Sequence, residues 1–224
     1  MSDLLMALEY IPPAIIAIIV ISNPVSTLAM FLTLTSEMSE EAKLRIAKRS
    51  SKYSLLILLF FAMTGLLIFQ IFGFSIGAFR IAGGILLVTT AMGMLYPREE
   101  KVSAETRDIA LMPMSIPFIS GPGTIVTVVV LISGAKDLGD GDLGLSLLAA
   151  SGVFLGIFIL IAISYLVMVH SERLFSIIGE EGNKALTKLM GLIVLSIAIQ
   201  FFINGIGDVL PMFMEIARSA AGTG

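Results

Sequence analysis

Ile21-Ser22-Asn23-Pro24 and Ile119-Ser120-Gly121-Pro122 share one pattern, an Ile-Ser pair followed by Asn-Pro or Gly-Pro. Each stretch lies near the middle of an apolar run that is long enough to cross a bilayer. Proline removes a backbone donor and clashes with the carbonyl one turn earlier, so neither run can continue as a regular helix. In hydrocarbon such a break persists only where protein or a water-filled cavity covers it. Two matched breaks in two halves of a chain are typical of transporter binding sites.

The composition is that of a membrane protein. The 224 residues are 57% hydrophobic and only 14% charged, whereas about a quarter of the residues in an ordinary soluble domain are charged. The chain contains no cysteine, which excludes disulfides, thiolate metal sites and cysteine nucleophiles, and its one histidine, His170, excludes a histidine-based metal cluster. No nucleophile–base pair is visible. We therefore expect no enzymatic activity, no metal and no cofactor.

Six apolar stretches have the length of membrane spans. They lie near 11–35, 53–73, 76–96, 110–133, 144–169 and 186–210. Pro12-Pro13 opens the first span, where a helix start tolerates proline. Of the 14 Lys and Arg residues, all but Arg80, Lys136 and Arg218 follow the first, third and fifth spans. The positive-inside rule then predicts a multi-pass protein of the cell (inner or plasma) membrane with both termini extracytoplasmic.

An internal repeat relates the two halves. The pattern around Pro24 aligns with the pattern around Pro122, and residues 82–89 resemble residues 189–196. Because each unit has three spans, the second unit must enter the membrane from the opposite side. The sequence therefore predicts an all-α protein of six transmembrane helices in a 3+3 inverted repeat. The units are residues 1–109 and 110–224, and the first and fourth helices are broken.

The two breaks offer a polar site inside the membrane. If the helices restart there, Asn23 and Gly121 become caps, and Pro24 and Pro122 take the first helical positions. The N–H groups of the restarted helices attract anions, while the preceding half-helices offer carbonyls to cations. Such a pocket suits a zwitterion. The candidate substrate-binding residues are Ser22, Asn23, Pro24, Ser26, Thr27, Ser120, Gly121, Pro122, Gly123 and Thr124.

A charged solute would leave an unpaired charge, because no Asp, Glu, Lys or Arg lies inside the breaks. The glycines near the breaks leave space without bulk, which favours a small neutral amino acid. Further candidates for lining the cavity are Gly83, Gly84, Gln200 and Asn204.

Simpler interpretations stay open for individual residues. A single proline in a membrane helix is most often only a kink, although the matched pair makes this reading weaker. Gln200 and Asn204 could bond between helices instead of lining a cavity. Gly152 and Gly156 form a small-xxx-small pair, as do Gly73 and Gly77, which favours helix packing and would allow a homo-oligomer. Asp208 is the best carboxylate candidate for a proton carrier, but an interface position in contact with solvent is the favoured reading.

The same residues carry a resemblance to the MarC family of integral membrane proteins, and it covers nearly the whole chain. It rests on Asn23-Pro24 with Ser26-Thr27-Leu28, on 80–87, on Pro117 with Gly121-Pro122-Gly123-Thr124, and on Gly191-Leu192-Ile193 with Asn204-Gly205-Ile206. The resemblance implies a six-span inner-membrane protein similar to small neutral amino acid transporters (SnatA-like) for glycine and alanine. It implies that Asn23, Pro24, Gly121, Pro122, Gly123 and Thr124 form the substrate-site backbone.

The leading hypothesis is a secondary transporter of glycine, alanine or serine that works by alternating access, one repeat moving against the other. Coupling to H⁺ or Na⁺ is open. The alternatives are a multidrug or metabolite exporter, which would favour more aromatic surface, and a passive channel. The expected partners are the amino acid and the lipid bilayer, with no nucleic acid.

Overall fold

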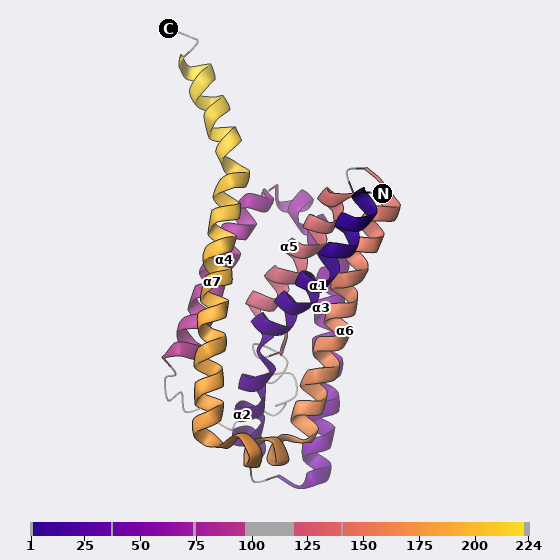
Figure 1. The fold of residues 1–224 in the computed structure, drawn as a ribbon, viewed down its shortest axis with the longest axis vertical. Helices are drawn as coiled ribbons and strands as arrows, with labels where there is room; N and C mark the ends of the chain where they lie inside the picture. Colours follow the sequence, from indigo (N-terminus) through magenta and orange to yellow (C-terminus); the bar gives the residue numbers. More distant parts are fainter. Residues whose placement is uncertain (1, 37, 74, 97–118, 140, 222–224) are drawn as a thin grey trace.

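The computed structural model describes residues 2–36, 38–73, 75–96, 119–139 and 141–221. All regular elements described in these ranges are helices, which confirms the predicted all-α class. They are α1 (Ser2–Ser22), α2 (Pro24–Thr35), α3 (Glu40–Phe72), α4 (Ile76–Leu95), α5 (Pro122–Leu138), α6 (Leu143–Val169) and α7 (Ser171–Ala221). In Figure 1, α1 begins and α7 ends toward the same end of the bundle, while α3 and α7 begin at the other end.

The first predicted span consists of two helices. α1 ends at Ser22 and α2 begins at Pro24, and Asn23 between them has φ 47° and ψ 76°, the left-handed conformation. Pro24 cannot donate a backbone hydrogen bond, and its ring disfavours the α conformation at the preceding residue. Asn is one of the few residues other than Gly that adopts the left-handed conformation. The local sequence therefore accounts for the interruption.

The N-terminal boundary differs from the prediction. α1 begins at Ser2, so the leader, residues 2–10 before the first predicted span, is helical, and Pro12-Pro13 lie inside the helix rather than at its start. The prediction that this proline pair begins the first helix is therefore wrong. Leu, Met and Ala dominate the leader, and these residues favour helix strongly enough to extend α1 through the pair.

The sixth predicted span is also part of a longer helical segment. α7 includes residues 171–185, which lie between the fifth and sixth predicted spans, and it continues through Pro211 to Ala221. Gly179, with φ 70°, interrupts the helical conformation inside this segment. Glu, Lys and Ala are good helix formers, so the polarity here marks a helix outside the apolar region rather than a loop. Only glycine adopts this positive φ at little cost.

Four described helical stretches are long and apolar enough to cross a membrane: Leu4–Leu32, Ile76–Leu95, Leu143–Val169 and Ser171–Pro211. They correspond to the first, third, fifth and sixth predicted spans. The second predicted span, 53–73, lies in α3 up to Phe72. The charged residues 40–52 before it belong to the same helix. α5 has 17 residues, and the predicted start of the fourth span, 110–118, lies outside the described residues.

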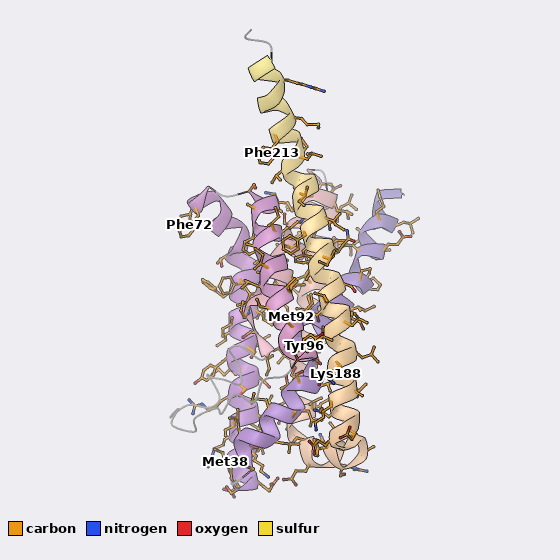
Figure 2. All side chains as sticks on the ribbon, turned by 90° about the vertical axis from the view of Figure 1, so that its left-hand side faces the viewer. Met38, Phe72, Met92, Tyr96, Lys188 and Phe213 are labelled. Atoms are coloured by element: carbon orange, nitrogen blue, oxygen red, sulfur yellow. The ribbon has the colours of Figure 1, made fainter. Side chains whose placement is uncertain are left out.

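Close helix packing divides the bundle into two groups. α4 pairs with α7, and the most extensive contact between described helices joins them; Figure 2 shows the two helices side by side. α1, α3 and α5 all pack against α6. α2 contacts α6 and α7, whereas α5 contacts α3 and α4, so the regions next to the breaks link the two groups.

Glycines permit the closest approaches. A Cβ on Gly152 would lie 2.9 Å from Ile11 Cα, and a Cβ on Gly156 would lie 3.2 Å from Ile15 Cα. The predicted packing role of this glycine pair is therefore confirmed between α6 and α1. Of the other predicted pair, Gly77 packs against α7, but Gly73 has φ 67° and no neighbour within 4 Å of a Cβ position, so it is a turn residue.

Candidate functional site

The two Ile-Ser stretches meet inside the protein. The hydroxyl of Ser22 donates a hydrogen bond to the carbonyl oxygen of Ile119, with Oγ and O 2.9 Å apart. Ser22, Asn23, Ile119 and Ser120 are all buried. Two regions that are 97 residues apart in the chain are thus in direct polar contact, at the end of α1 and immediately before α5.

Asn23 fixes the local geometry of the first break. Its N–H donates to the Ile19 carbonyl oxygen at 3.1 Å, and its own carbonyl oxygen accepts from the N–H groups of Ser26 and Thr27 at 3.1 and 3.4 Å. Its side-chain Nδ2 donates to Ser26 Oγ at 2.6 Å. Asn23 therefore occupies the N-cap position of α2, but its side chain does not bond to the first-turn backbone.

Two buried oxygens beside this break have no hydrogen-bond partner among the described residues. They are Oδ1 of Asn23 and Oγ1 of Thr27. Asn23 is 3% exposed and Thr27 is 0% exposed, so water does not reach these atoms from the protein surface. A buried polar atom without a partner costs free energy, which makes such atoms candidates for binding a polar ligand.

The second break presents the start of α5. Gly121 is its N-cap residue in an extended conformation, and Pro122 follows at the helix start. The Gly121 carbonyl oxygen accepts from the Ile125 N–H at 2.9 Å, and Thr127 Oγ1 donates to the Gly123 carbonyl oxygen at 2.8 Å. The first N–H groups of a helix have no partner within the helix. The start of α5 lies next to the bond between Ser22 and Ile119, at the end of α1.

The remaining predicted site residues are placed as follows. Gly123, Thr124, Gly121 and Gly83 are buried, Pro24 and Ser26 are partly buried, and Pro122 is exposed. Space beside three of the glycines is occupied: Val126 lies against Gly83, Phe202 against Gly84, and Leu87 against Gly123. These glycines allow helices to approach each other closely.

Gln200 and Asn204 do not lie with this group. Both are exposed on α7, and Gln200 Nε2 donates to Asn204 Oδ1 at 2.8 Å. Their amides are thus bonded to each other one helical turn apart, on a surface of the chain rather than at the breaks.

Sequence reasoning missed an ion pair between α4 and α7. Arg80 Nη1 lies 2.6 Å from Asp208 Oδ2, and these side chains are 17% and 35% exposed. The signal was present in the sequence, because opposite charges near the ends of two apolar spans commonly pair. The pair joins a helix of the first predicted repeat to a helix of the second.

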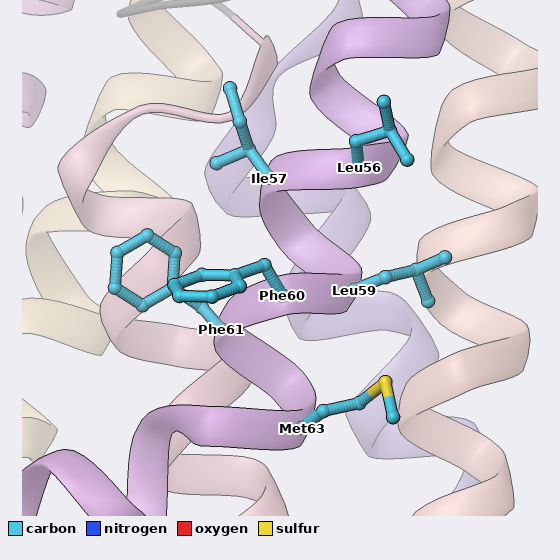
Figure 3. Close-up of a pocket in the computed structure, with 6 residues that line it drawn as sticks. All are labelled: Leu56, Ile57, Leu59, Phe60, Phe61 and Met63. Carbon is cyan, nitrogen blue, oxygen red and sulfur yellow. The ribbon is translucent and has the colours of Figure 1, made fainter.

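A shallow apolar hollow of about 510 Å³ lies elsewhere. It is lined by α3 alone, and Figure 3 shows its residues: Leu56, Ile57, Leu59, Phe60, Phe61 and Met63. None of the predicted site residues lines it. A hollow on the apolar side of one helix is suited to lipid chains, so we do not assign the substrate to it. Within the described residues, no group of His, Cys, Asp and Glu could hold a metal ion.

The long apolar helices are those of an integral membrane protein. The model of the MarC family of integral membrane proteins matches residues 8–210. The chain belongs to this family, and the family prediction from the sequence is confirmed.

Relatives match along nearly their whole length. The chain is 36% identical over 213 residues to the UPF0056 membrane protein MJ1677 of Methanocaldococcus jannaschii, covering 92% of this chain and 100% of that one. It is 32% identical over 217 residues to the UPF0056 membrane protein YvbG of Bacillus subtilis, covering 92% and 99%. The UPF0056 inner membrane protein MarC of Salmonella typhimurium is 26% identical over 212 residues, covering 89% and 95%. No solved structure matches the chain.

Proposed function

We propose that this protein is a secondary transporter of small neutral amino acids, with glycine, alanine and serine as substrates. The substrate binds where the end of α1 and the start of α5 meet. The observation that carries the proposal is the hydrogen bond between Ser22 Oγ and the Ile119 carbonyl oxygen, because it joins the two proline-containing stretches in one buried polar site. Interrupted helices at membrane depth are the usual place for a transporter to bind its substrate.

The chemistry of this site suits a zwitterion. The N-termini of α2 and α5 carry a partial positive charge that attracts a carboxylate. The Oδ1 atom of Asn23 is buried, has no partner among the described residues and can accept a hydrogen bond only, so it suits an ammonium group. Donors and acceptors side by side match both ends of one amino acid.

The small size of the proposed substrate follows from the apolar side chains around Gly123. Leu87 and Ile21 both lie within 4 Å of the position that a Cβ on Gly123 would take. Both side chains are buried, at 0% and 3% exposed. A substrate beside Gly123 therefore meets apolar bulk as soon as its own side chain grows, which favours glycine and alanine over larger amino acids.

The contacts between helices support the inverted repeat within this proposal. In such a repeat α2 corresponds to α5, α3 to α6, and α4 to α7. α2 contacts α6 and α7, and α5 contacts α3 and α4. Under this correspondence the α2–α6 contact is equivalent to the α5–α3 contact, and the α2–α7 contact to the α5–α4 contact. α4 and α7 then form a symmetric pair around the pseudo-two-fold axis. Alternating access through the two breaks is the mechanism that this arrangement favours.

The orientation in the membrane belongs to the same proposal. The basic cluster at the start of α3 lies at the end of the bundle where α7 begins, opposite the end where α1 begins (Figure 1). The positive-inside rule then places both termini outside the cytoplasm. Cysteine labelling at each terminus with an impermeant reagent in intact cells tests this topology, and the absence of native cysteine makes the labelling specific.

The function is tested by counterflow in proteoliposomes of the purified full chain. Vesicles are loaded with unlabelled glycine, and the entry of labelled glycine is measured against vesicles loaded with buffer or with leucine. Accelerated entry only with glycine, alanine or serine inside supports the carrier. Entry that does not depend on internal substrate indicates a channel instead. Dye accumulation without glycine exchange indicates an exporter of apolar compounds. Imposed H⁺ and Na⁺ gradients then identify the coupling ion.

A further inference from the structure

Leu87 lies where the two breaks come together. This α4 residue is 0% exposed and belongs to the same buried cluster as Ile21, the residue before Ser22. Its Cδ2 atom lies 2.7 Å from the position that a Cβ on Gly123 would take, and Ile21 Cγ2 lies 3.6 Å from that position. Leu87 thus contacts the end of the first half-helix and the start of α5 at once, although it belongs to neither.

The backbone around Leu87 is held from two sides. One turn earlier, Gly83 faces Val126 of α5, and Gly84 faces α7, where a Cβ would lie 3.0 Å from the Ala198 carbonyl oxygen. Without side chains at these two positions, α4 approaches both neighbouring helices closely. The position of Leu87 beside Gly123 is therefore set by helix packing and not by the rotamer of one flexible side chain.

We propose that Leu87 is the specificity-determining residue that limits the size of the transported amino acid. This inference rests on the proposed function and deepens it. A substrate held by the N-termini of α2 and α5 directs its side chain toward Leu87, whose buried side chain fills the space beside Gly123 and opposes a branched chain. Ile21 forms the neighbouring wall. Discrimination by one methylene group in an apolar pocket is on the order of 10–200-fold, so one leucine is enough to exclude valine.

The test compares the exchange of valine and glycine in counterflow for wild type, Leu87→Ala and Leu87→Val. The measured quantity is the ratio of the valine rate to the glycine rate, which does not depend on the amount of active protein. We expect the ratio to rise by on the order of tenfold or more in Leu87→Ala, and to rise less in Leu87→Val. The second variant removes only one methylene group and keeps the proposal testable if Leu87→Ala does not fold.

The matched control is Leu58→Ala. Leu58 is also 0% exposed, but it belongs to a cluster with Ala14, Ala62 and Ile157 that does not include the residues at the breaks. This variant should lower stability and leave the ratio as in wild type. If the foldable Leu87 variants exchange glycine with an unchanged ratio, the role of Leu87 is overturned and the transport function stands. If wild type exchanges no glycine, the proposed function fails, and the inference fails with it.

Discussion

The Ser22 hydroxyl group donates to the Ile119 carbonyl oxygen across 2.9 Å, and this bond holds the end of α1 against the residues that precede α5. Both residues are buried, at 6% and 0% exposed. The carbonyl oxygen of a residue that precedes a helix break has lost its ordinary helical partner, so a side chain from the other break is a suitable replacement. The Ser22 side chain thereby satisfies a backbone acceptor of the second stretch.

Ser22→Ala should uncouple the breaks. The Ile119 carbonyl oxygen loses its partner in a buried place, which costs about 1–3 kcal/mol of stability. The rate of glycine counterflow should fall further than the loss of folded protein accounts for, since the site geometry depends on this bond. The control is Ser151→Ala, because Ser151 donates to the Leu148 carbonyl oxygen within its own helix and is exposed. Equal exchange rates in these two variants would contradict a functional role of the Ser22 bond.

Substitutions at Asn23 should separate backbone conformation from binding. Asn23→Val places a β-branched residue at φ 47°, which costs about 1–2 kcal/mol and should lower the melting temperature. Asn23→Gly tolerates this backbone conformation but removes Oδ1, so the fold should persist while the KM for glycine exchange rises on the order of tenfold. Thermal unfolding in detergent and counterflow measure the two effects. A normal KM in Asn23→Gly would show that Oδ1 does not bind the substrate.

Two glycines on α7 give a test of the α4–α7 packing. A Cβ on Gly205 would lie 2.8 Å from the Gly77 carbonyl oxygen, whereas nothing lies within 4 Å of a Cβ on Gly207. Gly205→Ala should therefore destabilise the protein by about 1–3 kcal/mol. Gly207→Ala should be neutral or stabilising by up to about 1 kcal/mol, because alanine favours helix. Similar melting temperatures for the two variants would refute this close helix approach.

The ion pair between Arg80 and Asp208 should behave as a coupled unit. Asp208→Asn leaves the Arg80 guanidinium without its carboxylate, and Arg80→Gln leaves the carboxylate without its partner. The stability lost in the double variant should be smaller than the sum of the losses in the two single variants. We expect a coupling free energy of about 0.5–3 kcal/mol. Their partial exposure, 17% and 35%, places the expected value in the lower part of this range. A double-mutant cycle of melting temperatures measures it, and additive effects would rule out the coupling.

Lys43 provides a pH-dependent contact at the opposite end of the bundle. Its Nζ lies 2.5 Å from Glu172 Oε1 and 2.8 Å from Glu40 Oε1. These hydrogen bonds, first to Glu172 and then to Glu40, raise the pKa of Lys43 above its ordinary value of 10.5. The stabilisation is therefore fully present below pH 10.5 and is lost as the pH rises through the raised pKa.

As the pH rises by about two units from 9.5, the free energy of unfolding should fall more in wild type than in Lys43→Met. High salt should weaken the effect, since the pair is accessible to ions. Melting curves at several pH values measure the difference. Parallel pH profiles for the two proteins would show that the pair does not stabilise the fold.

Local sequence was sufficient for the helical class and for several helix boundaries. The predicted span 76–96 ends one residue after α4 (Ile76–Leu95), and the predicted span 144–169 begins one residue after the start of α6 (Leu143–Val169). Apolar length and turn residues set these ends, and both are local properties. Pro24 and Pro122 stand at helix starts for the same reason, since proline is restricted by its own ring.

Features that depend on packing were not readable in the same way. Leu87 lies in an apolar run like many others, and only the meeting of three helices brings it beside Gly123. Arg80 and Asp208 are 128 residues apart, so their pairing depends on how α4 and α7 align. The helical leader and residues 171–185 were missed because apolar content alone marked the spans, whereas helix propensity continues beyond the membrane.

The packing of α4 on α7 has a mechanical consequence. α4 lies in the first predicted repeat and α7 in the second, and Gly77, Gly84, Gly191 and Gly205 bring the two backbones together along their length. A movement of one predicted repeat against the other would separate the packed backbones of α4 and α7 each time. A boundary that runs between the α4–α7 pair and the group of α1, α3, α5 and α6 would cross less extensive contacts, those of α5 with α4 and of α7 with α1 and α6, together with the Lys43–Glu172 pair. The unit that the sequence predicts as a repeat and the unit that moves would then be different divisions of one chain, because the last helix of each predicted repeat belongs to the α4–α7 pair.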